Sequence, residues 1–263
     1  MAAIREGMRL TYGNEPFQYG DLYIPDENTR HPVVILIHGG FWRAAYELSL
    51  MTKLAQDLVA RGIAVWNIEY RRVGNKGGGW PGTLLDVAQA SDYLRTLADA
   101  HNLDLERVVA VGHSAGGHLA LWLGTRGKLT FDHELTSSTH PLTLCGIVSL
   151  AGAMDLEHVW ALGLGNDAVV GLLDGSPEEV PERYAMASPL EYLPLGIEQV
   201  LLHGTDDDRV PLIVSQEYAD RARYTGDIVK LIKLVGANHF VLIDPASTTW
   251  SRTLAEIKRL IRL

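Results

Sequence analysis

Six short apolar runs, separated by longer stretches with helical spacing, constrain the fold of this chain more than any other feature. The runs are Val33–Ile37, Ala64–Ile68, Val108–Val111, Gly146–Leu150, Val200–Leu202 and Ile228–Leu234. They mostly lack the alternation of apolar and polar residues that is typical of a strand with one solvent-exposed face. Each run therefore predicts a strand covered on both faces, as in a parallel sheet flanked by helices.

The stretches between these runs show the spacing of amphipathic helices. Apolar side chains fall on one face over residues 48–58, 84–98 and 250–261. Ahead of them, Arg9–Tyr12 and Phe17–Ile24 flank Gly13-Asn14 and predict a leading hairpin. The alternation of strand and helix predicts right-handed crossovers in an α/β fold, with a mostly parallel central sheet of about eight strands.

The chain of 263 residues shows no repeat period and no Ser/Pro/Gly linker, so we expect a single domain over residues 1–263. Residues 152–194 do not follow the alternation of strand and helix, because they contain no convincing strand and many Gly, Pro and Glu residues. This segment is too long for a plain connection. It predicts a small helical insertion, like a lid, that is able to cover a site.

Composition and charge narrow the classes of function. Hydrophobic residues make up 47% of the chain and charged residues 21%, which is ordinary for a globular protein and excludes a disordered one. The net charge is −9 and no basic block stands out, so we expect neither nucleic acid nor a membrane as partner. The N-terminus has no apolar signal region, and we expect a cytoplasmic protein.

Cys145, the single cysteine, lies in an apolar stretch and is expected to pack as a small hydrophobe.

The strongest local signal is G-H-S-A-G at residues 112–116, which follows the run Val108–Val111 and precedes an apolar helical stretch. Strand, tight turn and helix are the setting of a nucleophile elbow. Such a turn exposes the hydroxyl of Ser114 at the carboxyl edge of the sheet. It also aims the N–H of Ala115 at the place where negative charge develops. The pentapeptide alone leaves open a glycine-rich turn with an incidental serine, and the flanking pattern argues against that alternative.

A second signal, H-G-G-F-W at residues 38–42, directly follows the run Val33–Ile37. The loop after the third strand of such a sheet supplies the other oxyanion donors. We expect the backbone N–H groups of Gly40 and Phe41 to be these donors, together with Ala115. Trp42 has two interpretations: it lines the site and binds substrate, or it packs in the core.

A serine nucleophile needs a base, and the base needs an acid that orients it. The run Val200–Leu202 ends in H-G-T-D-D-D-R-V-P at residues 203–211, and the spacing D-x-x-V-P selects Asp207 from three adjacent aspartates. The last run leads into N-H-F, which places His239 in the loop before the C-terminal helix. The resulting order, Ser114, Asp207, His239, is the order that a hydrolase fold requires. No H-E-x-x-H, Cys/His cluster or phosphate-binding glycine loop is present, so neither a metal nor a nucleotide cofactor is expected.

Together these residues resemble the α/β-hydrolase superfamily and, within it, the esterase/lipase and kynurenine-formamidase-like group. The resemblance covers nearly the whole chain, through the four motifs above, I-E-Y-R-R at residues 68–72 and W-P-G-T-L-L-D at residues 80–86. It implies a serine hydrolase that needs no cofactor and acts on an ester or activated amide of a small molecule. Phe41 stands where hormone-sensitive-lipase-like esterases carry a third glycine, which moves the likeness toward the formamidase-like side. Glu69, Arg71 and Asp86 look like members of structural ion pairs behind the site.

The sequence leaves four functions in competition. The first is hydrolysis of carboxylic esters with small or medium acyl groups, through an acyl-enzyme on Ser114. The second is an arylformamidase that acts on N-formylkynurenine. The third is a small peptidase related to prolyl oligopeptidases, which usually carry a large extra domain that this chain lacks. The fourth is a non-catalytic ligand receptor on a hydrolase fold, which predicts a damaged triad. A homodimer is left open.

Overall fold

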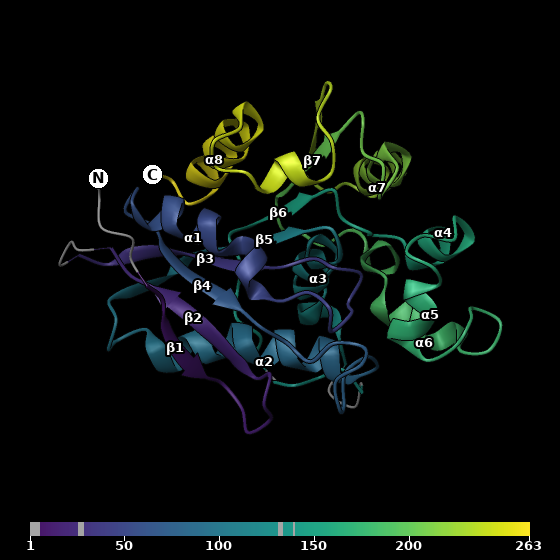
Figure 1. The fold of residues 1–263 in the computed structure, drawn as a ribbon, viewed down its shortest axis with the longest axis horizontal. Coiled ribbons are helices and arrows are strands. Elements are labelled where there is room, and N and C mark those ends of the chain that lie inside the picture. The colour runs from purple at the N-terminus through teal and green to yellow at the C-terminus, as the bar shows by residue number, and fades with distance from the viewer. Residues whose placement is uncertain (1–5, 26–28, 131–133, 139) are drawn as a thin grey trace.

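A computed structural model of the protein describes residues 6–25, 29–130, 134–138 and 140–263. Its centre is an eight-stranded sheet with the order β1-β2-β4-β3-β5-β6-β7-β8 (Figure 1). The strands are β1 (Met8–Thr11), β2 (Tyr19–Tyr23), β3 (His31–Ile37), β4 (Ala64–Ile68), β5 (Leu103–His113), β6 (Gly146–Leu150), β7 (Gln199–Gly204) and β8 (Val229–Leu234). The pairs β1–β2 and β2–β4 are antiparallel, and all others are parallel. The predicted hairpin and the mostly parallel sheet are therefore confirmed.

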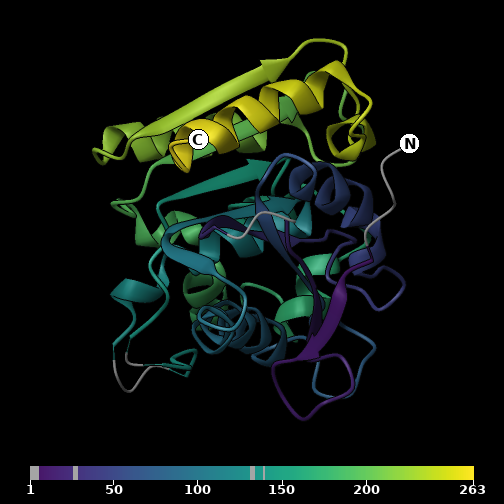
Figure 2. The same cartoon turned by 90° about the vertical axis from the view of Figure 1, so that its left-hand side faces the viewer.

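Helices cover both faces of the sheet, which explains why its central strands are apolar throughout. One face is covered by α1 (Thr52–Val59) and α8 (Thr248–Leu260), whose buried side chains pack with one set of strand residues. The other face is covered by α2 (Gly82–Leu97), α3 (Ala115–Leu123) and α7 (Leu212–Tyr224). Figure 2 shows α8 lying along one side of the sheet with α2 on the other. All seven residues of β3 and all five of β4 are buried between these layers.

The insertion after β6 is helical, as predicted. It contains α4 (Leu156–Ala161), α5 (Ala168–Leu173), α6 (Pro181–Ala187) and short 3₁₀ turns, and it lies beside the carboxyl end of the sheet (Figure 1). Two side chains of α3 bind it to the core: His118 Nε2 donates to Ala187 O at 2.9 Å and Trp122 Nε1 donates to Met186 O at 3.3 Å. The helix behind the predicted nucleophile thus holds the insertion in place. Among the described residues, no helix is long and apolar enough to cross a membrane.

The burial of the His118 ring makes the stability of the protein depend on pH. Burial lowers the pKa of His118 from 6.5 to about 4, so the folded protein keeps the ring neutral where the unfolded chain binds a proton. The unfolded state therefore binds more protons between pH 6.5 and pH 4, and the free energy of unfolding falls as the pH falls through this window. In denaturant titrations, His118→Gln should make that slope shallower by about 1 kcal/mol per pH unit. The exposed control His140→Gln should keep the wild-type slope, and an unchanged slope in His118→Gln would contradict the assignment.

Candidate active site

Ser114 occupies the sharp turn between β5 and α3. Its backbone has φ 57° and ψ −122°, a region that L-residues rarely adopt and that surrounding structure must enforce. Ser114 N–H donates to Leu150 O at 2.8 Å, which fixes the turn against β6. At Gly116 a Cβ atom would lie 2.2 Å from Ile37 O, so only glycine lets α3 pack this closely on β3. The structure thus has the strained strand–turn–helix geometry of a nucleophile elbow.

The loop after β3 lies directly against this elbow. A Cβ atom on Gly39 would lie 2.6 Å from His113 O and 2.9 Å from Ser114 Cβ, so the loop backbone touches the serine. Phe41 has a positive φ of 53°, which residues other than glycine rarely adopt. Within the described residues, neither Phe41 N–H nor Ala115 N–H makes a hydrogen bond. Two backbone donors beside Ser114 are therefore free to bind a developing oxyanion.

Asp207 and His239 meet across the loops that follow β7 and β8. His239 Nδ1 and Asp207 Oδ2 are 2.7 Å apart, while Asp207 Oδ1 accepts the N–H groups of Arg209 and Val210, each at 2.9 Å. Burial alone would raise the pKa of Asp207, but the neighbouring rings of His203 and His239 outweigh it and hold the pKa far below its ordinary value. The carboxylate thus stays ionised next to the His239 ring. Its two neighbours, Asp206 and Asp208, are both exposed.

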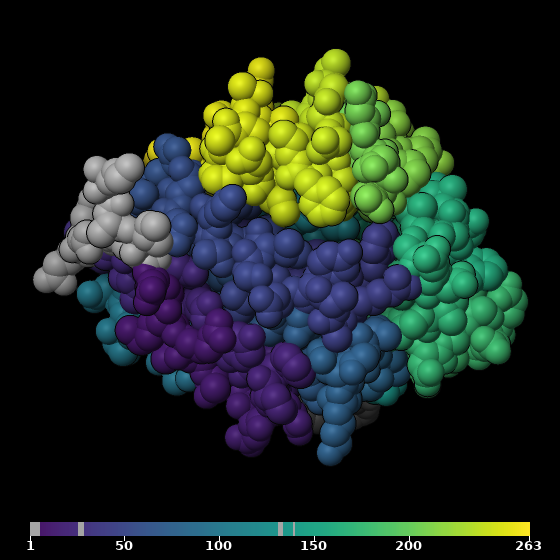
Figure 3. Space-filling model, viewed as in Figure 1, coloured from purple at the N-terminus to yellow at the C-terminus, as the bar shows by residue number. Residues whose placement is uncertain are grey.

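Ser114 and His239 form part of the wall of one small pocket, with a volume of about 80 Å³. The pocket is lined by Gly40, Phe41, Tyr46, Leu50, His113, Ser114, Arg209, His239 and Phe240. Figure 3 shows the yellow C-terminal segments meeting the dark blue segments around residues 40–60 on one face of the molecule. Among the described contacts, no hydrogen bond joins Ser114 to the His239 ring. Such bonds are often long before substrate binds.

Two further histidines hold Asp207 and His239 in place. His113 Nε2 donates to His239 O at 3.0 Å, and the two rings lie 4.5 Å apart. Burial, aided by the nearby His239, lowers the pKa of His113 from 6.5 to about 3, so its ring is neutral. His203 Nε2 donates to Val210 O at 2.8 Å and lies 3.5 Å from Asp207 Oδ2. His203 thus binds the backbone of the loop that carries Asp207.

Buried ion pairs support the loop after β3 from behind. His38 Nε2 and Glu69 Oε1 are 2.8 Å apart, and Arg72 lies 3.4 Å from the same oxygen. Burial would raise the pKa of Glu69, but the His38 hydrogen bond and the Arg72 charge hold it below its ordinary value. Farther back, Arg71 pairs with Asp86 at 2.7 Å. The predicted structural role of Glu69, Arg71 and Asp86 agrees with these positions.

Trp42 lies in the core. Its side chain is 1% exposed and meets the His118 ring edge-on, with the centroids 5.3 Å apart. It is not among the residues that line the pocket. The second of its two interpretations, core packing, therefore fits its position.

The aromatic residues that do line the pocket, apart from Phe41, were not expected from the sequence. They are Tyr46 and Phe240, which are 41% and 49% exposed. Tyr46 comes from an irregular loop, and Phe240 directly follows the predicted base. The N-H-F motif contained Phe240, but its spacing gave no sign of the direction of the ring.

The insertion contacts the loop after β3 and does not itself line the pocket. Arg43 Nη2 donates to Gly165 O at 2.5 Å and to Asn166 O at 2.7 Å. A Cβ atom on Gly165 would lie 2.4 Å from the Phe41 ring, so that ring packs on the insertion. No described residue of the insertion lines the pocket. Arg43 thus clamps the strained loop that carries the candidate oxyanion donors.

Removing this clamp should slow turnover. Because a strained loop keeps its conformation only through its surroundings, Arg43→Ala should lower kcat for p-nitrophenyl acetate by about tenfold, less than the loss of a whole oxyanion donor. Steady-state kinetics with the exposed control Arg252→Ala would check this, and we expect that control to keep wild-type kcat. Equal kcat values in both variants would show that the clamp is not needed.

No group of three or more His, Cys, Asp or Glu side chains able to hold a metal ion occurs among the described residues. The polar side chains at the pocket are instead a hydroxyl, two imidazoles, a phenol and a guanidinium. This set can transfer an acyl group through a nucleophile and a general base.

Comparison with known proteins agrees with this chemistry. The BD-FAE family model matches residues 20–221. Probable isoprenylcysteine alpha-carbonyl methylesterase ICME from Oryza sativa subsp. japonica is 30% identical over 244 residues, covering 88% of this chain and 57% of that protein. Kynurenine formamidase avaC from Aspergillus versicolor is 26% identical, covering 71% of this chain and 74% of that protein. The chain spans between about half and three fifths of the length of the first curated relatives it matches.

Solved structures show the same fold. A truncated form of a carbohydrate esterase from gut microbiota superposes with a TM-score of 0.86 at 20% identity, covering 98% of this chain and 97% of that one. A thermophilic esterase from Thermogutta terrifontis, Est2, superposes with a TM-score of 0.77 at 19% identity, covering 98% of this chain and 92% of that one. At these identities the likeness concerns the fold alone.

Proposed function

The chain belongs to the BD-FAE family of α/β-hydrolases, and on this premise we propose that it hydrolyses carboxylic esters with small or medium acyl groups through an acyl-enzyme on Ser114. The observation that carries the proposal is the 2.7 Å contact between Asp207 and His239, with the His239 ring on the wall of the pocket that also contains Ser114. The esterase and methylesterase relatives support the bond type.

In the proposed reaction His239 takes the hydroxyl proton of Ser114 while Oγ attacks the acyl carbon. Asp207 keeps the proton of the ring on Nδ1 and stabilises the imidazolium that forms. The N–H groups of Phe41 and Ala115, with Gly40 beside them, bind the oxyanion. The carbon–oxygen bond to the alcohol then breaks, and His239 gives its proton to that alcohol. Water, activated by the same ring, releases the acid and restores the Ser114 hydroxyl.

Hydrolysis of an aryl formamide is the second candidate. It is favoured by the formamidase relative, which matches over 74% of its length, and by the aromatic side chain of Phe41 at the pocket. A formyl group is the smallest acyl group, so the same nucleophile and base would serve both reactions.

A side-by-side comparison of kcat/KM tests the proposal. The substrates are short p-nitrophenyl esters, N-formylkynurenine and an aminoacyl-arylamide, because kcat/KM ratios measure the discrimination between competing substrates. We expect the esters to give the highest values. A higher value for the formamide or the arylamide would assign the second candidate or a peptidase instead. Tight binding without turnover of any substrate would assign a receptor.

A further inference from the structure

The charge of the pocket is opposite to that of the protein. The chain carries a formal net charge of −9, yet the only side chain with a permanent charge among the described pocket residues is Arg209. No carboxylate lines the pocket within the described part of the chain. A cation that faces no carboxylate inside the pocket favours a negatively charged group on the ligand.

The guanidinium of Arg209 has little else to bind. Its one ion pair among the described residues, to Asp208 at 3.7 Å, joins two side chains that are 53% and 68% exposed, and such surface pairs contribute little to stability. The other two arginines near the loop after β3 already have buried or backbone partners. Arg43 is bound to two carbonyls of the insertion, and Arg72 is 3% exposed and paired with Glu69. Arg209 can therefore turn to an incoming ligand without losing a strong partner.

The backbone of Arg209 is held by the catalytic machinery itself. Its N–H donates to Asp207 Oδ1 at 2.9 Å, while Asp207 Oδ2 holds His239. Ser114, His239 and Arg209 thus share one pocket, and the backbone from which the Arg209 side chain extends is held beside His239.

The rest of the pocket supplies apolar contact area for a flat or apolar body. Phe41 and the half-exposed rings of Tyr46 and Phe240 line it together with Leu50. Exposed aromatic side chains grouped beside an arginine are typical of a binding surface.

We propose that Arg209 binds a carboxylate of the substrate, so that the preferred esters have an aromatic or apolar body with an anionic group a short distance from the scissile carbonyl. This inference rests on the proposed ester hydrolysis and adds the charge of the substrate to it. Arg209 is a specificity-determining residue in this account, and it takes no part in the proton transfers.

Matched pairs of substrates test the proposal. The pairs are 4-acetoxybenzoate with 4-acetoxybenzamide, and 3-acetoxybenzoate with 3-acetoxybenzamide, which differ in charge but little in shape. The readout is the ratio of kcat/KM for the anionic ester to that for the neutral ester. Comparing this ratio between the wild type and a variant cancels the intrinsic reactivity of each ester.

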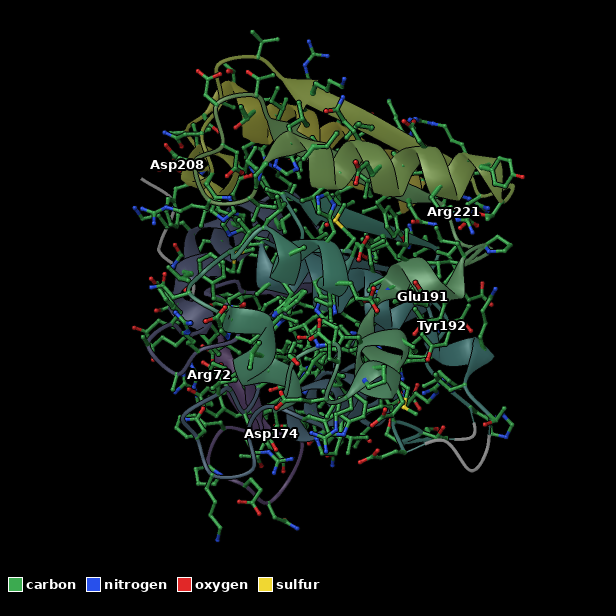
Figure 4. The ribbon with its side chains drawn as sticks, turned by 90° about the vertical axis from the view of Figure 1, so that its right-hand side faces the viewer. Arg72, Asp174, Glu191, Tyr192, Asp208 and Arg221 are labelled. Carbon is green, nitrogen blue, oxygen red and sulfur yellow. The ribbon has the colours of Figure 1, made fainter. Side chains whose placement is uncertain are left out.

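In Arg209→Gln we expect the ratio to fall about tenfold for at least one pair, since a charge-assisted hydrogen bond is lost. Arg209→Lys should retain part of the preference, because it keeps the charge but loses the planar fork. Raising the salt concentration should lower the wild-type ratio. The matched control is Arg221→Gln on α7. Figure 4 shows Arg221 at the opposite end of the molecule from Asp208, the neighbour of Arg209.

The outcomes separate the inference from the function on which it rests. An unchanged ratio in Arg209→Gln for both pairs, with all esters still hydrolysed, would overturn the role of Arg209 and leave ester hydrolysis standing. An equal fall of the ratio in Arg221→Gln would also overturn it, because the preference would then come from the overall field of the protein. If the wild type hydrolysed none of the four esters, the proposed function and the inference would fall together.

Discussion

Replacing Ser114 by alanine should lower kcat for p-nitrophenyl acetate by about 10⁴ to 10⁶, since the variant lacks the hydroxyl that the proposed reaction uses as its nucleophile. The hydroxyl is not needed for the fold, because the described contacts that fix the elbow come from its backbone: Ser114 N–H binds Leu150 O, and Ser114 O accepts from Gly117 and His118. Circular dichroism and the midpoint of thermal unfolding should therefore be close to those of the wild type.

Turnover and folding must be measured on the same preparation of this variant. A folded Ser114→Ala protein with activity near the wild type would end the assignment of Ser114 as nucleophile. Residual activity at the level of an oxyanion hole alone, about 10³-fold above the uncatalysed reaction, is compatible with it.

Asp207→Asn is the second variant with a large expected effect, a loss of about 10⁴ in kcat. The carboxylate accepts from His239 through Oδ2, and an amide cannot offer two acceptors to both His239 and the N–H groups of Arg209 and Val210. His239 would lose the ion that orients its ring and stabilises its cation. A pH profile of kcat/KM would show whether the base now titrates differently, which a merely structural loss would not produce.

The two neighbouring aspartates are matched controls for this variant. Asp206 binds only its neighbour Thr205 among the described side chains, and Asp208 is exposed. Asp206→Asn and Asp208→Asn should keep kcat for the neutral ester within about twofold of the wild type, as surface substitutions usually do. A loss in either control as large as that in Asp207→Asn would mean that the spacing D-x-x-V-P selects the wrong carboxylate.

Much of the fold could be predicted because strands that are buried on both faces consist of consecutive apolar residues. The run Ala64–Ile68 coincides with β4, and Gly146–Leu150 coincides with β6. The strand β5 is longer than its apolar run, since it begins at Leu103 with half-exposed residues that carry no such signal. Helix α7 was not predicted, because its polar residues mask the few apolar positions that it buries.

The sequence predicts which residues come together at the candidate site but not the shape of the pocket. Strand ends mark where Ser114, Asp207 and His239 lie along the chain, and parallel strands bring their carboxyl ends to one edge of the sheet. The positions of Tyr46 and Arg209 depend on loops whose paths are set by contacts distant in sequence. The same is true of Arg43, whose carbonyl partners lie more than 120 positions away in the insertion. No local pattern encodes such a contact.

Covalent labelling with a fluorophosphonate tests the central claim most directly. The reagent forms a stable bond with a serine that a neighbouring base activates, and peptide mass spectrometry locates the adduct. We predict one adduct per chain, on Ser114, with labelling slowed by several orders of magnitude in His239→Ala. Ester hydrolysis by a protein whose Ser114 stays unmodified, or an adduct on another side chain that accounts for the loss of activity, would contradict the account.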